Sequence, residues 1–340
     1  MVTIKEIAQR AGVSTATVSN VIHGKSRHVS VETVKRIQAL IDEMGYEREA
    51  GKRVRSSDNA KLVAIIIRYH QGFENSVLAD PFYGVVTGSI EQELRSRGLY
   101  LMLYASSNMD DIFRMLMTWD VDGVIAVSFT KEDCQKLQSL IQKPMISIDA
   151  FGPDDLAAGI PDVGLEDETG GLLMTRHLLD LGYETIFVAG VSNTGIDNRR
   201  WSGAKQATNS EQFLNGKHKL EFIELGGTLD LREKCYQQIT RHLPFRKKTA
   251  FFFTSDSLAM EAISFFAKRG ITVPDSFGVA GFDDSINAVS FSIPPLTTIH
   301  QDVPMKARIA VEELVSAIQD PNYIPKSHKL PVTLISRKSV

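Results

Sequence analysis

The residue types that most often carry out catalysis or bind metals form no recognised pattern in this sequence. Its eight histidines include no H-E-x-x-H pair and no paired ligand spacing, which argues against a metal site. Neither a G-x-x-x-x-G-K-[ST] phosphate loop nor a G-x-G-x-x-G turn is present. The segment Gly190–Gly195 resembles a nucleophile elbow but is one residue too long, so we interpret it as a polar loop. We therefore expect a protein that is not an enzyme and needs no cofactor.

A group of small polar residues near the N-terminus is suited to contact with DNA. Val18, Val21 and Ile22 recur at helical spacing, so they should face inward and leave the opposite face polar. That face carries no acidic residue and consists of Thr15, Ala16, Ser19, Asn20 and His23. Such side chains can approach base edges in the major groove without a carboxylate near the phosphates. The pattern favours a helix that reads DNA.

Two further helices should hold this helix in a compact head. Thr3 and Glu6 have the spacing of a capping box that starts a first helix, which Gly12 would end. Ser14 is placed to cap the second helix and Ser30 the third. The third helix shows a buried stripe made of Val34, Ile37, Leu40, Ile41 and Met44. Residues 1–46 therefore predict a helix-turn-helix domain; a plain helical cap on a larger domain would explain the periodicity but not the polar face.

The next segment, residues 47–61, is charged and lacks an apolar stripe, so we expect a hinge or linker. Residues 1–61 contain 11 Lys and Arg against 7 Asp and Glu, whereas the whole chain has a net charge of −3. A small basic head thus precedes a large acidic body. This asymmetry agrees with DNA binding, although solvated charge alone would also produce it.

Residues 62–340 alternate between short aliphatic runs and segments of helical length. The expected strands are Leu62–Ile67, Leu101–Ala105, Gly123–Val127, Pro144–Ile148, Thr185–Ala189, Leu220–Glu224, Ala250–Phe253 and Phe277–Gly281. The expected helices are Gly84–Arg97, Asp110–Trp119, Glu132–Gln142, Glu168–Leu181, Asn198–Phe213, Leu229–His242 and Ser257–Arg269. The alternation predicts an α/β body of doubly wound parallel sheets, and eight strands favour two similar lobes with a cleft between them.

Composition narrows the class of protein further. The chain of 340 residues is 43% hydrophobic, enough to fill real cores, but its longest apolar run is far too short to cross a membrane. The charged N-terminus does not resemble a signal peptide, so we expect a soluble, cytoplasmic protein. The two cysteines, Cys134 and Cys235, lie too far apart to indicate a disulfide framework.

Motifs along the whole chain resemble the LacI/GalR family of bacterial transcription regulators. In order, they are Thr3–Ala8, Ala11–Ser14, Thr17–Ser19, Gly45-Tyr46, Asp80–Tyr83, Val121–Ile125, Gly182-Tyr183, Arg200–Gly203, Gly281–Asp284, Pro295–Ile299 and Leu334–Val340. The resemblance implies a helix-turn-helix head, a hinge and a two-lobed body like periplasmic sugar-binding proteins. It also implies a homodimer on a near-palindromic operator, controlled by a small molecule, carbohydrate in type, held between the lobes. We place lobe 1 at about 62–158 and 299–322, and lobe 2 at about 159–298 and 323–340.

The same resemblance implies roles for individual residues. On DNA, Thr15, Ala16 and Asn20 match base-reading positions, and Asn20 is chemically able to pair with adenine. The residues expected at phosphates are Ser14, Thr17, Ser19 and Tyr46. In the body, Arg200 and Asp283 match the main polar ligand positions; the further candidates are Phe82, Tyr83, Asp149, Trp201 and Ser255. Buried Asp and Arg are also often paired for purely structural reasons.

The hinge departs from the family pattern. The family usually has A-R-x-L there, with a leucine that enters the minor groove and kinks the duplex. Here Arg53 is kept, but Arg55 takes the place of the leucine, and Val54 is a competing wedge. A charged side chain is costly to place between stacked bases, so we expect Arg55 to lie along a narrow minor groove and the DNA to bend less.

The sequence is also compatible with two alternative functions. A solute-binding protein would share the body, yet it would need an export signal and would have no use for the head. A regulator of the same fold could respond to a partner protein in place of a sugar. Neither the sequence of the loop at 190–198 nor the aromatic residues identify the effector.

Overall fold

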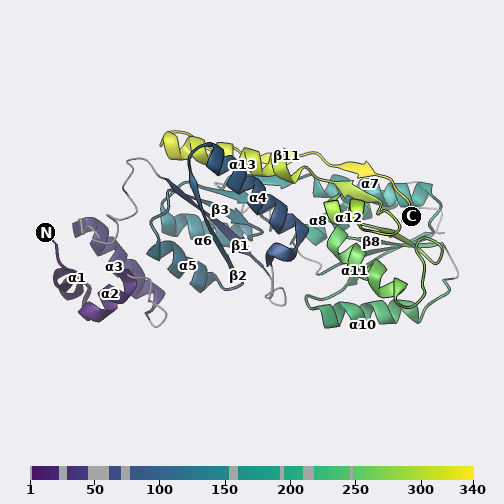
Figure 1. Ribbon diagram of the computed structural model, residues 1–340, viewed down its shortest axis with the longest axis horizontal. Coiled ribbons are helices and arrows are strands. Elements are labelled where there is room, and N and C mark those ends of the chain that lie inside the picture. Colours follow the sequence, from purple (N-terminus) through teal and green to yellow (C-terminus); the bar gives the residue numbers. More distant parts are fainter. Residues whose placement is uncertain are drawn as a thin grey trace. The chain divides into compact units, whose positions relative to one another are not determined.

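The computed structural model describes residues 2–22, 29–44, 61–69, 77–152, 160–191, 195–209, 218–245 and 248–340 (Figure 1). Two compact units comprise residues 1–68, 90–161 and 310–326 in the first and 69–89, 162–309 and 327–340 in the second. These units group residues by packing, so the domain boundaries expected from the sequence stay a prediction. Within the described ranges, no helix is long and apolar enough to span a membrane, and no acidic, histidine or cysteine cluster could hold a metal.

The described residues of the N-terminal head form three helices: α1 (Ile4–Ala11), α2 (Thr15–Ile22) and α3 (Val31–Met44). The capping box is confirmed, because Glu6 N donates to Thr3 Oγ1 at 3.3 Å and Thr3 N donates to the Glu6 carboxylate at 2.8 Å. Gly12 ends α1 in the left-handed conformation at φ 64°, and Ser14 Oγ accepts from Thr17 N at 3.1 Å. The expected apolar stripes meet in one core: Ile7, Ala8, Ala11, Val18, Val21, Ile22, Val34, Ile37 and Ile41.

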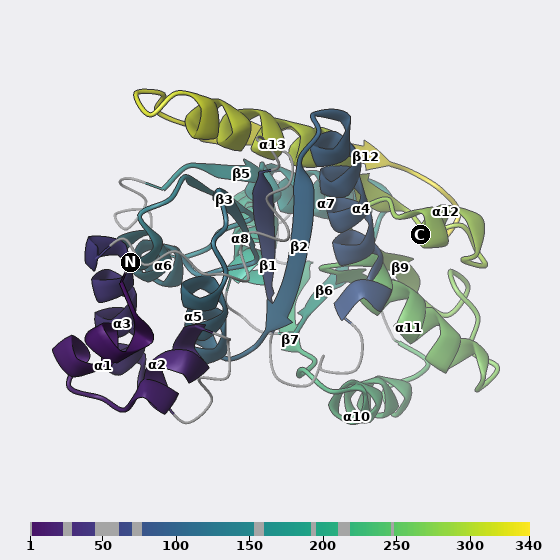
Figure 2. The same cartoon turned by 60° about the vertical axis from the view of Figure 1, so that its left-hand side comes forward.

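In the first unit, four parallel strands are neighbours in the order β4-β3-β1-β2. They are β1 (Leu62–Arg68), β2 (Tyr100–Ser106), β3 (Gly123–Val127) and β4 (Met145–Ile148). The helices α5 (Met109–Thr118) and α6 (Lys131–Ile141) belong to this unit, and the division between the units falls within α4 (Pro81–Ser96) and α13 (Val303–Gln319). Figure 2 shows β1 and β2 side by side.

The second unit is built on a parallel sheet in the order β7-β6-β8-β9. Its strands are β6 (Thr185–Gly190), β7 (Lys219–Glu224), β8 (Thr249–Phe253) and β9 (Gly278–Ala280). Further pairs are β5 (Asp162–Leu165) with β11 (His328–Leu330), parallel, and β10 (Thr298–His300) with β12 (Thr333–Ile335), antiparallel. Its helices are α7 (Asp167–Asp180), α8 (Gly195–Gln206), α10 (Leu229–Thr240), α11 (Asp256–Ala267) and α12 (Ile286–Ser290), with short 3-10 helices η2 (Val77–Ala79) and η4 (Ala207–Asn209).

The predicted fold class is confirmed, and all eight expected strands are present, their ends shifted by at most one residue. One helix differs. The expectation of a helix over Asn198–Phe213 is wrong for Ala207–Asn209, which form a 3-10 turn, and its last part, residues 210–213, lies outside the described residues. There the Thr208 hydroxyl donates to the Lys205 carbonyl at 2.6 Å and tightens the end of the helix.

Glycines bring α7 and α8 into backbone contact. A Cβ atom on Gly203 would lie 1.9 Å from the Glu168 carbonyl oxygen, and one on Gly171 would lie 2.0 Å from the Arg200 carbonyl oxygen. Real Cβ atoms do not approach that closely, so only glycine fits at either position. The close contact fixes the place of Arg200 on α8 relative to the start of α7, where Asp167 lies.

Substitution of Gly203 by alanine should therefore destabilise the protein by about 1–3 kcal/mol or more, because the added methyl group meets backbone that cannot move aside. Gly88 in α4 is the matched control, since nothing lies within 4 Å of its would-be Cβ. Gly88→Ala should stabilise by about 0.5–1 kcal/mol through helix propensity. Urea unfolding of both variants measures the difference, and equal free energies of unfolding would contradict the close contact.

Candidate functional site

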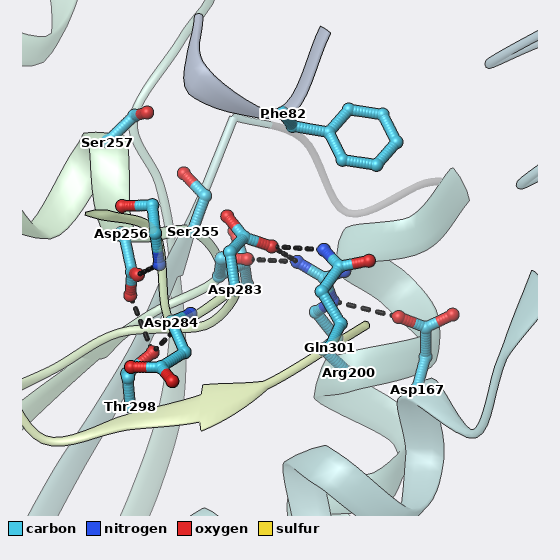
Figure 3. A network of polar contacts seen from close by, with 12 residues as sticks. Phe82, Asp167, Arg200, Ser255, Asp256, Ser257, Asp283, Asp284, Thr298 and Gln301 are labelled. Atoms are coloured by element: carbon cyan, nitrogen blue, oxygen red, sulfur yellow. Dashed lines mark hydrogen bonds and ion pairs between the residues drawn. The ribbon is translucent and has the colours of Figure 1, made fainter. Parts of the chain in front are cut away.

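A buried arginine is the centre of a polar network in the second unit. Arg200, 7% exposed, donates from Nε to Asp167 Oδ1 at 2.9 Å and from a terminal nitrogen to the Thr254 backbone carbonyl (Figure 3). Its guanidinium carbon lies 3.5 Å from the centroid of the Phe282 ring. Burial by itself lowers the pKa of Arg200, but Asp167 and Asp283 more than offset this and the pKa is raised. The side chain is therefore a permanent, rigidly held cation.

Asp283 faces this cation from the turn after β9. Its Oδ1 atom lies 3.8 Å from a terminal nitrogen of Arg200 and accepts a hydrogen bond of 2.6 Å from Gln301 Nε2. Figure 3 shows the three side chains pointing toward one another. Asp283 has φ 126° and Asp284 φ 56°, backbone conformations that non-glycine residues rarely adopt. Such strain is held in place by surrounding contacts and is typical of functional sites.

The contacts that hold this turn come from neighbouring carboxylates. Asp256 Oδ1 accepts from the Thr298 hydroxyl at 2.6 Å, and its Oδ2 accepts from Ser285 N at 2.7 Å. On the other side, Asp284 accepts from Arg337 at 2.6 Å and lies 3.0 Å from His300 Nδ1. Both carboxylates thus anchor the backbone that carries Asp283.

Burial shapes the protonation of the carboxylates in this network. It raises the pKa of Asp80, and it raises the pKa of Asp256 to about 6. Burial also raises the pKa of Asp283; Arg200 opposes the rise, whereas Asp256 and Asp80 add to it. A ligand that donates hydroxyl hydrogens to the ionised Asp283 would favour that form.

The expected ligand residues come from both units and make different contacts. The Phe82 ring makes an edge-to-face contact with Tyr83 at 5.3 Å between centroids, and Ser255 caps α11 by accepting from Leu258 N at 3.3 Å. Trp201 follows Arg200 on α8 but packs against the Phe222 ring at 5.7 Å between centroids, and Asp149 directly follows β4 in the first unit. The structure brings Arg200 and Asp283 together; the ligand roles of all these residues stay predictions.

On the predicted DNA-reading helix α2, Thr15, Ala16 and Asn20 are exposed, while Ser19 is half-buried. The Ser14 and Thr17 hydroxyl oxygens lie 2.8 Å apart and hydrogen-bond to each other. The remaining expected DNA contacts lie outside the described residues: His23, Tyr46, Arg53, Val54 and Arg55.

Several members of the network were not expected from the sequence, among them Asp167, Gln301 and Lys306. Asp167 pairs with a residue 33 positions further along the chain, and as a first-turn acid it resembles an ordinary helix-start residue. Lys306 donates from Nζ to Gln301 Oε1 at 3.0 Å and is fully buried. A lysine in a helical pattern usually indicates the solvated face, so no signal in the sequence marked it.

The raised pKa of Asp256 predicts how stability depends on pH. The folded state binds this proton more tightly than the unfolded chain does, so the free energy of unfolding should fall as pH rises from the ordinary aspartate pKa of 3.8 to about 6. Asp256→Asn should flatten this part of the profile. Chemical unfolding at a series of pH values tests it, and an unchanged slope in the variant would contradict the assignment.

Comparisons with known proteins identify related families for the N-terminal head and for part of the body. Residues 3–49 match the model of bacterial regulatory proteins of the lacI family, and residues 175–340 match a periplasmic binding protein-like domain. The HTH-type transcriptional repressor PurR of Photobacterium profundum is 30% identical over 357 aligned residues, covering 100% of this chain and 99% of that protein.

Solved structures share the fold. A lac repressor dimer bound to operator and the anti-inducer ONPF has a TM-score of 0.67 at 20% identity, covering 99% of this chain and 98% of that one. A complex of the transcriptional regulator CelR with cellobiose has a TM-score of 0.68 at 22% identity, covering both chains completely. At these identities the likeness shows the fold alone. The full-length match to PurR carries the assignment further: the chain belongs to the lacI family of bacterial regulatory proteins and is a DNA-binding transcription regulator.

Proposed function

We propose that this protein is a repressor whose affinity for operator DNA is controlled by a small molecule bound at Arg200 and Asp283. The observation that carries the proposal is this pair: a permanently charged guanidinium and a carboxylate 3.8 Å apart, both held by buried partners. A planar donor fork beside a hydroxyl acceptor suits a polyhydroxylated ligand, and the nearby Phe82 ring offers a flat apolar face. A sugar or sugar derivative fits this chemistry best.

The domain arrangement proposed with this function is a head at residues 1–46, a linker at 47–61 and a ligand-binding body at 62–340. In the head, the exposed Thr15, Ala16 and Asn20 of α2 would read bases, with Ser14 and Thr17 at phosphates. One such helix makes few base contacts. Two symmetric heads add their contacts and span two half-sites of a near-palindromic operator.

A homodimer would place two heads on one operator, and the second unit offers a face for it. Around α12, the apolar side chains of Ile286, Val289, Phe291 and Ile293 are exposed, Phe291 at 71% and Ile293 at 87%. Residues 285–295 contain no charged residue. Two copies of such a face can meet across a twofold axis without like-charge repulsion, so a second copy of this chain is the partner that fits.

Asn20→Ala should lose about 1–3 kcal/mol of discrimination at one operator position per half-site and leave binding to random DNA nearly unchanged. The reason is that a paired contact to a base edge carries sequence information, whereas phosphate contacts do not. Fluorescence anisotropy with a selected and a random duplex measures both affinities. Equal losses on the two duplexes would refute a reading role for Asn20.

Asp283→Asn should abolish the effector response. Operator binding measured without effector should stay as in the wild type. Loss of a hydrogen bond to a charged acceptor weakens ligand affinity by about tenfold or more. A thermal-shift screen of sugars, sugar phosphates and nucleobases identifies the effector, because a ligand at 100 times its dissociation constant stabilises by about 2.7 kcal/mol. An Asp283→Asn protein that responds like wild type would contradict the proposed site.

Ile293→Asp should convert the dimer into a monomer, because two buried carboxylates would face each other across the twofold axis. Ile324 in the first unit, 81% exposed, provides the matched control, since Ile324→Asp adds the same charge at another exposed isoleucine. Analytical ultracentrifugation distinguishes the two states. A dimer that survives Ile293→Asp, or one lost equally in Ile324→Asp, would exclude this face.

A further inference from the structure

A buried lysine lies beside the proposed effector site. Lys306, in the first turn of α13, has no exposed surface, and no other lysine in the described ranges is buried. Burial of an ammonium group is costly unless specific partners hold it. Its neighbours therefore show what the charge does.

The lysine fixes the orientation of Gln301. Lys306 Nζ has hydrogens to donate and no lone pair to accept with, so the amide oxygen of Gln301 must face it, at 3.0 Å. The amide nitrogen is then directed to the other side, where it donates to Asp283 Oδ1 at 2.6 Å. Lys306 thus donates to Gln301, and Gln301 in turn donates to the carboxylate of Asp283.

The same ammonium group contacts the aromatic candidate. Lys306 Nζ lies 5.3 Å from the centroid of the Phe82 ring, within the range of a cation–π interaction. One lysine thus touches, directly or through one amide, two residues that the proposed function places around the ligand.

We propose that Lys306 is a positioning residue of the effector site: through Gln301 it holds Oδ1 of Asp283 and leaves Oδ2 of that carboxylate to accept a hydroxyl of the ligand. This inference rests on the proposed function for the role of Asp283 as a ligand group. The chain of hydrogen bonds from Lys306 through Gln301 to Asp283, called the relay below, can be tested without any ligand.

Several groups determine how easily Asp283 is protonated. Arg200 of α8 and the Gln301 amide favour the ionised form, whereas burial, Asp256 of α11 and Asp80, just before α4, disfavour it. Without Lys306 the amide is free to turn over and present its oxygen to the carboxylate. That loss leaves the ionised form less favoured, so Asp283 should take up its proton at a higher pH.

The experiment follows the Asp283 carboxyl carbon by NMR during a pH titration of the whole chain, without ligand and labelled at aspartate carboxyls with carbon-13. Asp283→Asn assigns the signal. We expect Lys306→Met to move the midpoint to higher pH. Lys306→Arg keeps a buried donor and charge, so its midpoint should lie close to that of the wild type. Gln301→Leu cuts the same link with Lys306 intact and should shift the midpoint in the same direction.

Arg232→Met is the control for a merely structural effect. Arg232 is also buried in the second unit, where it pairs with Glu261 at 2.8 Å through two nitrogens. Its loss should lower stability and leave the Asp283 midpoint unmoved. An Asp283 midpoint unchanged in both Lys306→Met and Gln301→Leu would overturn the relay, as would an equal shift in Arg232→Met.

The two proposals fail in different ways. A relay that behaves as expected, with an effector response that survives Asp283→Asn, refutes the proposed function alone. An effector response that is lost in Asp283→Asn, with an Asp283 titration insensitive to Lys306 and Gln301, refutes the positioning role alone.

Discussion

The second unit depends on the ion pair between Arg200 and Asp167. A guanidinium removed from water is tolerated only when charged and hydrogen-bonding partners replace the lost solvent, and removal of one partner typically costs about 3–5 kcal/mol. Asp167 Oδ1, the Thr254 carbonyl and the Phe282 ring supply that environment. The glycines at the α7–α8 contact serve the same end, because the pair forms only if the two helices approach to backbone distance.

The remaining polar groups extend from this pair to Asp283. The backbone of Asp283 is strained, and burial raises the pKa of its side chain. Both the conformation and the ionised form of this residue are therefore disfavoured. A folded protein keeps such a residue only where surrounding contacts hold it, and here Asp256 and Asp284 do so. Strain and burial at one carboxylate next to a fixed cation agree with a site that a ligand completes.

The sequence predicted regular elements well and long-range polar contacts poorly. Gly123–Val127 is a continuous apolar run, and such runs form buried parallel strands whatever their partners are. The capping box of α1 and the Gly12 turn are likewise local features that a few adjacent residues determine. The strands β5, β10, β11 and β12 were missed because each has only three or four residues and none forms a continuous apolar run.

The polar site was predicted less completely than the helices and strands, because its members lie far apart in the sequence. Arg200 and Asp283 were identified by resemblance of their motifs, but nothing local in the sequence indicated that Asp167 would pair with Arg200. Lys306 was missed because the groups that it contacts, Gln301 and the Phe82 ring, lie outside its own helix. Networks of this kind are set by how elements pack, which periodicity and spacing do not encode.

Every role proposed for the head requires that this chain bind one DNA sequence in preference to others. Fluorescence anisotropy of the whole 340-residue chain measures this preference, with a duplex selected by the protein from a random pool compared with an unselected duplex at physiological salt. A regulator of this kind should bind the selected duplex at least about a thousandfold more tightly. Equal affinities for the two duplexes, or binding to neither, would show that the head does not read sequence.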